Sequence, residues 1–463
     1  MRKTLAIAAL TASALTAALS ACGSGKGGDG ADTVVTHPLP DTLRVATLYS
    51  PTSYFIYREE EMGYDYALVA DWASDKGMVL DIRVAPKLET AIQWLDSAKV
   101  DIIAYQVPVT DTYNRQVLHC GPVSETSQIL VQKKGRDTLL TDVTQLVGHD
   151  VYVERNSKYH QRISNLNSEL GGGIRIHPVY RDTLITEDLM EMVAKGEIPM
   201  TIVDSDIARV SRTYYPGLDI SLSLSFGQKA QWAVARDREW LADSVNAWFA
   251  QDLPRLHTRE VYRRYFEESK TMPSHTAAVT FRGGKVSPYD HLFKQYAKEI
   301  GWDWRLLAAI GFVESGYDNS VVSWAGARGI MQIMPVTARA MGSTPEAMTD
   351  PETSIRVAVK AIKSIDKMMA RYISDPQKRR PFVIASYNSG GAHIIDAIAL
   401  AKKHGHNPEQ WHGSVDMALL MKSDPVHYND PVVKYGYFRG TQTVEFVRRV
   451  ENFYNKAQKY VRQ

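Results

Sequence analysis

The sequence has few cysteines and almost no excess charge. Its 463 residues include 2 cysteines, Cys22 and Cys120, and 54 basic against 52 acidic residues give a formal net charge of +2. This cysteine content does not support a disulfide framework even in an oxidising compartment, and Cys120 is expected to be a buried, inert thiol. The charge balance does not favour nucleic-acid binding.

Patterns typical of metal and phosphate sites are also missing. His404 and His406 are isolated, so they are interpreted as part of a surface loop rather than a metal site. Gly326 and Gly329 are not followed by Lys-Ser/Thr, which excludes a phosphate-binding P-loop. We expect a protein without metal or cofactor. With 44% hydrophobic residues, its length suffices for two or three domains with cores of their own.

The first residues read as a targeting segment. Arg2-Lys3 precede an apolar stretch at residues 5–19, and residues 19–22 read Leu-Ser-Ala-Cys. This ending resembles the lipobox of bacterial lipoproteins, which implies removal of residues 1–21 and lipidation of Cys22. A plain transmembrane anchor is the alternative. The residue directly after Cys22 is not Asp, so the expected location is the outer membrane, on its periplasmic face, with residues 22–40 as a flexible tether.

A candidate catalytic acid follows an apolar helical pattern. Apolar residues at 306, 307, 310 and 313 form the stripe of a helix that Asp303 opens and Gly316 closes. Glu314 lies in the last turn, where the helix dipole and burial both disfavour its charged form. We therefore predict a raised pKa and a role as general acid. A solvated Glu at a helix end is the alternative on local grounds.

Three ordered motifs carry a family resemblance. They are Glu-Ser at residues 314–315, Gly-Ile-Met-Gln at 329–332 and Ser-Tyr-Asn at 386–388. Together they resemble the signature blocks of soluble-lytic-transglycosylase-type domains. The resemblance implies a lysozyme-like, mainly helical fold that cleaves the MurNAc–GlcNAc bond of peptidoglycan glycan strands with one Glu and no metal. It also implies a sugar-binding groove lined by Ser315, Met331, Gln332, Tyr387 and Asn388.

The expected chemistry needs one carboxyl group. Glu314 would protonate the glycosidic oxygen and then take the proton of the C6 hydroxyl of the same muramic acid, which leaves a 1,6-anhydro end. Hydrolytic glycosidases instead use two carboxyl groups about 5 to 9.5 Å apart. Asp318 is the nearest candidate for a second one and is interpreted as structural. A hydrolytic muramidase, or a binding or sensor lipoprotein that grips glycan without turnover, are the alternatives.

The region before the catalytic motifs alternates strands and helices. Strands are expected at residues 43–47, 80–84 and 100–104, and a second series begins at residue 151, which predicts two α/β lobes with parallel sheets. Residues 41–270 resemble family-3 solute-binding domains, on Gly63-Tyr64-Asp65-Tyr66, Val100-Asp101-Ile102-Ile103, Arg115 with Gly121-Pro122-Val123, and Ile202-Val203-Asp204.

That resemblance implies a ligand site in the N-terminal region. Arg115 would hold the carboxylate of a ligand, and Asp204 would hold its ammonium group. A wall-derived peptide or an amino-acid-like molecule would present both groups. An Arg paired with a neighbouring acid and an Asp capping a helix is the structural alternative.

The closing segment completes the predicted organisation. Residues 435–440 and 444–454 resemble the membrane-bound lytic murein transglycosylase F family, although Gln442 and Phe446 stand where that family usually has Glu and Tyr. The predicted fold is a two-lobed α/β domain like periplasmic binding proteins, followed by a mainly α lysozyme-like domain. The predicted boundaries are a signal peptide at 1–21, a tether at 22–40, a regulatory domain at 41–270, a linker at 271–287 and a catalytic domain at 288–463.

Overall fold

A computed structural model describes residues 38–135, 139–179, 186–268, 281 and 284–462. The predicted signal peptide, Cys22 and most of the predicted tether and linker lie outside these residues. Within them, no helix has both the length and the apolar content needed to span a membrane.

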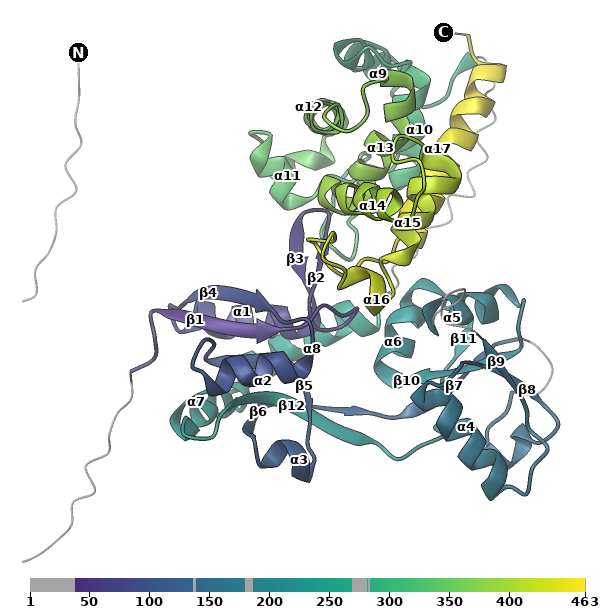
Figure 1. The fold of residues 1–463 in the computed structure, drawn as a ribbon. Coiled ribbons are helices and arrows are strands. Elements are labelled where there is room, and N and C mark those ends of the chain that lie inside the picture. Colours follow the sequence, from purple (N-terminus) through teal and green to yellow (C-terminus); the bar gives the residue numbers. More distant parts are fainter. Residues whose placement is uncertain (1–37, 136–138, 180–185, 269–280, 282–283, 463) are drawn as a thin grey trace, which may run out of the picture. The chain divides into compact units, whose positions relative to one another are not determined.

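The first lobe contains a five-stranded sheet in the order β4-β1-β5-β12-β6 (Figure 1). β1 pairs in parallel with β4 and β5, whereas β12 runs antiparallel to both β5 and β6. The predicted strands are present, but the expectation of a parallel sheet is wrong, because β12 is added by the chain as it returns from the second lobe. The strands are β1 (Thr42–Thr47), β4 (Val79–Val84), β5 (Ile102–Pro108), β6 (Val117–Thr126) and β12 (Gln228–Ala235).

Helices cover this sheet and complete its core. Leu68 and Trp72 of α1 pack with Trp232 of β12 in one apolar cluster, in which Cys120 is also buried, as predicted. Burial raises the pKa of the Cys120 thiol to about 12. The helices are α1 (Tyr64–Asp75), α2 (Leu88–Asp96), α3 (Asp111–Asn114), α7 (Glu239–Phe249) and α8 (Asp252–Phe266).

The second lobe has its own five-stranded sheet, in the order β11-β7-β10-β8-β9. β8, β9 and β10 are parallel, as predicted, while β7 pairs antiparallel with β10 and β11. The chain passes between the lobes twice, from β6 to β7 and from β11 to β12. The elements are β7 (Gln128–Lys133), β8 (Asp150–Glu154), β9 (Arg175–Val179), β10 (Met200–Asp204), β11 (Leu218–Asp219), α4 (Lys158–Glu169), α5 (Thr186–Lys195) and α6 (Ser205–Tyr214).

A short hairpin interrupts the first lobe between β1 and α1. It consists of β2 (Phe55–Tyr57) and β3 (Glu60–Met62), which pair antiparallel. The turn residues Arg58 and Glu59 both have positive φ, at 49° and 68°. Two successive residues with positive φ match the right-handed twist of the strands in a tight hairpin. Residues other than glycine adopt this backbone conformation only at a cost in free energy. The hairpin tip therefore carries two charged side chains on a constrained turn.

The C-terminal part is helical, as predicted, with one core that draws on most of its helices. α10 begins after Asp303, whose side chain accepts a hydrogen bond from Arg305 N, and ends at Gly316 in the left-handed conformation. Both ends therefore confirm the prediction. The helices are α9 (Asp290–Ala297), α10 (Trp304–Ser315), α11 (Pro335–Ala340), α12 (Pro351–Met369), α13 (Pro376–Ser389), α14 (Gly391–Lys403), α15 (Asp416–Met421), α16 (Pro425–Tyr428) and α17 (Thr441–Tyr460).

Candidate active site

Glu314 is the buried carboxyl group of the helical domain's signature region. It lies in the last turn of α10, and only 1% of its surface is exposed. Burial raises the pKa of this carboxyl group, and the charge of Arg58 opposes the rise, with a smaller opposing contribution from Arg449. The sequence prediction of a buried acid with a raised pKa at this helix end is therefore confirmed.

The partner of Glu314 comes from the hairpin of the first lobe. The Arg58 Nη2 atom donates to both carboxylate oxygens of Glu314, at 3.1 and 3.2 Å. Its Nη1 atom donates to the backbone oxygen of Gln332 at 3.0 Å. Arg58 is itself only 7% exposed, so this ion pair is largely shielded from water. A guanidinium group thus occupies the two oxygens through which the acid would act.

Two more hydrogen bonds hold the hairpin against the same face. Arg58 N donates to Ser389 O at 3.2 Å, and Val336 N donates to the Glu60 carboxylate at 3.1 Å. Gly390, which has a φ of 89°, lets the two backbones approach closely. A Cβ atom at this position would lie 3.1 Å from Glu59 N.

Further contacts join the first lobe to the helical domain away from the hairpin. The core of that lobe extends to Ala325, Ala327 and Met334 of the helical domain. Arg264 Nε on α8 also donates to Trp324 O at 3.0 Å. The hairpin is therefore one part of a wider contact between the first lobe and the loop that carries the second signature motif.

Most of the predicted groove residues gather around Glu314, and their polar side chains bond inward. Ser315 Oγ donates to Ile330 O at 2.9 Å, and the Gln332 side-chain amide donates to Val321 O and Gly329 O at 3.0 and 2.9 Å. Tyr387 OH donates to Met331 O at 2.7 Å. These bonds shape the loop that surrounds the acid.

Two of the five residues line an open space beside the ion pair. Gln332 and Tyr387 border a cavity of about 260 Å³ together with Arg58, Glu59 and Gly390. Ser315 and Met331 are fully buried. Asn388 borders a separate small cavity, which Gln442 and Ile56 of the hairpin also line, and it accepts a hydrogen bond from Thr443 Oγ1 at 2.8 Å. Phe446, which like Gln442 departs from the usual residue of the family, is buried in the helical core.

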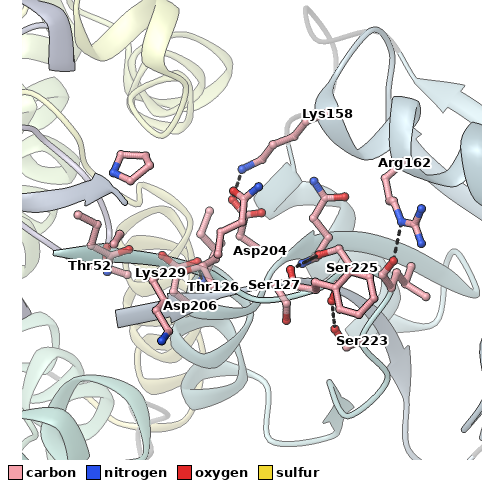
Figure 2. A pocket seen from close by; sticks show the side chains of 18 of the residues that line it. Thr52, Thr126, Ser127, Lys158, Arg162, Asp204, Asp206, Ser223, Ser225 and Lys229 are labelled. Atoms are coloured by element: carbon pink, nitrogen blue, oxygen red, sulfur yellow. Dashed lines mark hydrogen bonds and ion pairs between the residues drawn. The ribbon is translucent and has the colours of Figure 1, made fainter. Parts of the chain in front are cut away.

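A larger cavity lies in the N-terminal region. It has a volume of about 1010 Å³ and takes its walls from both lobes, including Thr52 and Lys229 from the first and Lys158, Asp204 and Asp206 from the second (Figure 2). Asp204, which was predicted as a ligand residue, forms an ion pair with Lys158. Burial and the charge of Asp204 raise the pKa of Asp206 to about 6.

Arg115 is not brought to this cavity. It follows α3, and its Nε atom donates to Asp111 O at 3.2 Å in an exposed position. The expectation that Arg115 and Asp204 would face one ligand is not met by this arrangement, because α3 turns the arginine back onto its own helix. Lys158, Arg162 and Lys229 are the cations that border the cavity.

Sequence reasoning missed Arg58 altogether. Arg58 and Glu314 lie 256 residues apart, and a charged turn in the run Tyr-Arg-Glu-Glu-Glu gives no local signal of burial. Neither Arg58 nor Glu59 is a residue type that marks a tight turn, so the sequence did not indicate the hairpin either.

Comparison with known proteins places both parts of the chain. Residues 43–268 match the model for bacterial extracellular solute-binding proteins, family 3, and residues 291–409 match the transglycosylase SLT domain. The chain is 31% identical to the membrane-bound lytic murein transglycosylase F of Pseudomonas fluorescens over 89% of this chain and 84% of that protein. It is 29% identical to the protein of the same name from Desulfosudis oleivorans over 89% and 88%. With an SLT domain whose buried Glu314 lies among the predicted motifs, the chain is a lytic transglycosylase that belongs to the membrane-bound lytic murein transglycosylase F family.

Proposed function

We propose that the chain cleaves the β-1,4 bond between MurNAc and GlcNAc without water and leaves 1,6-anhydromuramic acid ends. Glu314 donates its proton to the glycosidic oxygen as the bond from that oxygen to C1 breaks, and GlcNAc leaves with a free hydroxyl. The resulting carboxylate then accepts the C6 hydroxyl proton, and the C6 oxygen bonds to C1. The observation that carries this proposal is the single buried acid at the end of α10.

The surroundings of Glu314 favour this route over hydrolysis. Asp318, the nearest following carboxylate in the sequence, is exposed and accepts hydrogen bonds from Ser320 N and Oγ at 2.8 and 2.6 Å. It is therefore engaged in a local turn rather than placed to activate a water molecule, as the second carboxylate of an inverting hydrolase would be. Mass spectrometry of digested sacculi separates the routes, because anhydro ends support ours and reducing ends contradict it.

The N-terminal domain, in this proposal, holds the enzyme inactive until a ligand binds between its lobes. The first lobe supplies Arg58, which neutralises and covers the acid. The second lobe contributes Tyr214 and Tyr215, whose ring centres lie 4.6 and 5.5 Å from the guanidinium carbon of Arg439 in the helical domain. Because the helical domain contacts both lobes, a relative movement of the lobes changes at least one of these contacts.

The ligand in this proposal is a wall-derived peptide or an amino-acid-like molecule. Its ammonium group would meet Asp204 and Asp206, and its carboxylates would meet Lys229 or Arg162, all of which border the 1010 Å³ cavity. A ligand shifts the balance between two conformations only if it binds one of them more tightly than the other. In this proposal the ligand binds more tightly when the two lobes close on it, and this closure releases the hairpin from Glu314.

Asp204→Asn is expected to weaken peptide binding to the full-length protein by roughly ten- to a hundredfold, because it removes the charge that meets the ammonium group. Calorimetry with a disaccharide-free stem peptide measures the change. Arg115→Ala is the matched control and should bind as the unmodified protein does, since Arg115 lies outside the cavity. Equal affinity of the Asp204 variant would contradict this ligand assignment.

We also propose that a lipid on Cys22 anchors the chain to the periplasmic face of the outer membrane. Support comes from the Leu-Ser-Ala-Cys sequence at residues 19–22 and from the relatives named as membrane-bound. At least two acyl chains would make such an anchor lasting.

Cys22→Ala is expected to move the protein from the membrane fraction to the soluble fraction, because the acyl chains have no other attachment point in this proposal. Sedimentation followed by a salt wash and immunoblotting measures the distribution. Cys120→Ala serves as the control, because that thiol is buried in the first lobe. A Cys22 variant that still sediments with washed membranes would place the anchor elsewhere.

A further inference from the structure

A buried polar network lies directly behind the hairpin. Lys422, which is fully buried, donates to Asp396 Oδ2 at 2.6 Å and bonds to His393 Nδ1 at 2.8 Å. Asp396 also accepts from the backbone nitrogens of Lys434 and Tyr435, both at 2.9 Å. The imidazole of His393 stacks on Phe438 with ring centres 4.2 Å apart. Each side chain of the network is thus held in one orientation.

The network fixes which nitrogen of His393 carries the proton. Burial and the neighbouring Lys422 charge hold the pKa of His393 well below its usual value, so the ring is neutral and has one N–H group. Nδ1 accepts the hydrogen bond of the Lys422 ammonium group, which leaves the proton on Nε2. That Nε2–H group donates to the backbone oxygen of Ile56 at 2.8 Å.

Ile56 belongs to the hairpin, so His393 Nε2 is aimed out of the helical domain rather than into it. Ile56 lies two residues before Arg58 along the chain, which corresponds to roughly 7 Å of extended backbone. The face that the hairpin covers therefore presents the Glu314 acid, the acceptor Ser389 O and the donor His393 Nε2 side by side. A ligand that replaces the hairpin must satisfy these groups, since buried polar groups without partners are costly.

We propose that His393 is a substrate-binding residue, and that Ile56 O occupies the place of an amide carbonyl of the glycan strand. In the active state the Nε2–H group donates to that carbonyl, which belongs to an N-acetyl group or to the peptide on the lactyl side chain. Lys422 and Asp396 act as positioning residues that keep the donor on Nε2. The inference rests on the proposed function, because it requires glycan to enter where the hairpin now lies.

Binding measured without turnover tests this inference separately from the proposed chemistry. The parent is the full-length Arg58→Ala, Glu314→Gln double variant, in which the ion pair is removed and cleavage is blocked. Calorimetry with uncleaved glycan strands gives Kd for this parent and for the parent with His393→Met added. We expect His393→Met to weaken binding by roughly threefold to tenfold, as for loss of one neutral hydrogen bond. His393→Gln, whose amide can still donate near the Nε2 position, should recover most of the loss.

Modified strands identify the carbonyl. If strands without stem peptide abolish the difference in Kd between the parent and its His393→Met variant, the peptide carbonyl is the acceptor. If de-N-acetylated strands abolish that difference, the acetyl carbonyl is the acceptor. Binding of intact strands that is equal or tighter in His393→Met than in its parent would overturn the inference, because the loss of a contact to the hairpin alone does not weaken the binding of glycan.

A second pair of variants covers the case in which His393→Met lowers the melting temperature severely. His393→Gln against His393→Asn then gives the same comparison, because Asn cannot reach the Nε2 position. Product analysis with Glu314 intact reports on the proposed chemistry independently of these affinities.

Discussion

Arg58→Ala is expected to raise the turnover of peptidoglycan by roughly 5- to 150-fold, the usual range of coupling between two sites. The substitution removes the guanidinium group that donates to both carboxylate oxygens of Glu314 and to Gln332 O, and so uncovers the acid. Release of soluble muropeptides from purified sacculi measures the change. Added stem peptide should activate this variant less than the unmodified protein, because the contact between Arg58 and Glu314 that the ligand would break is already absent.

A matched arginine provides the control for this substitution. Arg83 also lies in the first lobe and also pairs with a carboxylate, Asp81, but each side chain of this pair is 40% exposed and lies on the edge strand β4. Arg83→Ala should leave turnover unchanged. If Arg58→Ala is no more active than the Arg83 variant while its fold is intact, the hairpin contact does not restrain the enzyme.

The pH dependence of the Arg58 variant follows from the charges around the acid. The Arg58 charge lowers the pKa of Glu314 against the effect of burial. In the unmodified protein Arg58 therefore holds unprotonated Glu314 in the covered state, so a rise in pH favours that inactive state. A general acid also loses activity as pH rises through its pKa. Arg58→Ala removes the first of these two effects and leaves the second. The alkaline limb of the activity profile should therefore lie at higher pH in Arg58→Ala than in the unmodified protein. Arg58 thus restrains the enzyme twice, by covering the acid and by favouring its unprotonated form.

Local patterns predicted the parts of the structure that local forces determine. The helix around Glu314 is bounded by a cap at Asp303 and a left-handed glycine at 316, and both signals act within a few residues. The buried strands of the two lobes could be predicted for the same reason. The antiparallel strand β12 could not, because its place depends on a chain that returns from the other lobe.

In the candidate site, too, the sequence predicted the features set by neighbouring residues but not those set by distant contacts. Motifs located Glu314 and the loop around it, but could not separate side chains that face the cavity from those that build its wall. Gln332 has a φ of 48° and turns its amide back to Val321 and Gly329, so its backbone oxygen faces Arg58 instead. Arg58 and His393 depend on contacts across hundreds of residues, which no spacing within a motif can reveal.

Glu314→Gln is expected to lower the release of anhydromuropeptides by roughly 10² to 10⁴, the usual contribution of general acid–base catalysis. The amide keeps the size and part of the hydrogen bonding of the acid, but it has no proton of suitable acidity to give to the glycosidic oxygen and no carboxylate to accept one from the C6 hydroxyl. The substitution also breaks the ion pair with Arg58, and this second effect acts in the opposite direction because it frees the hairpin.

The two effects separate when the substitution is made in the Arg58→Ala protein. There the ion pair is already absent, so the remaining change reports on the acid alone, and the loss should be at least as large as in the unmodified background. Asp318→Asn in the same background is the control, because Asp318 accepts hydrogen bonds from Ser320 in a local turn and should leave turnover near that of the parent. Mass spectrometry of the products completes the comparison. Near-full release of anhydro products by Glu314→Gln would remove this residue from the reaction, and a comparable loss in Asp318→Asn would instead indicate a second carboxylate and a hydrolytic route.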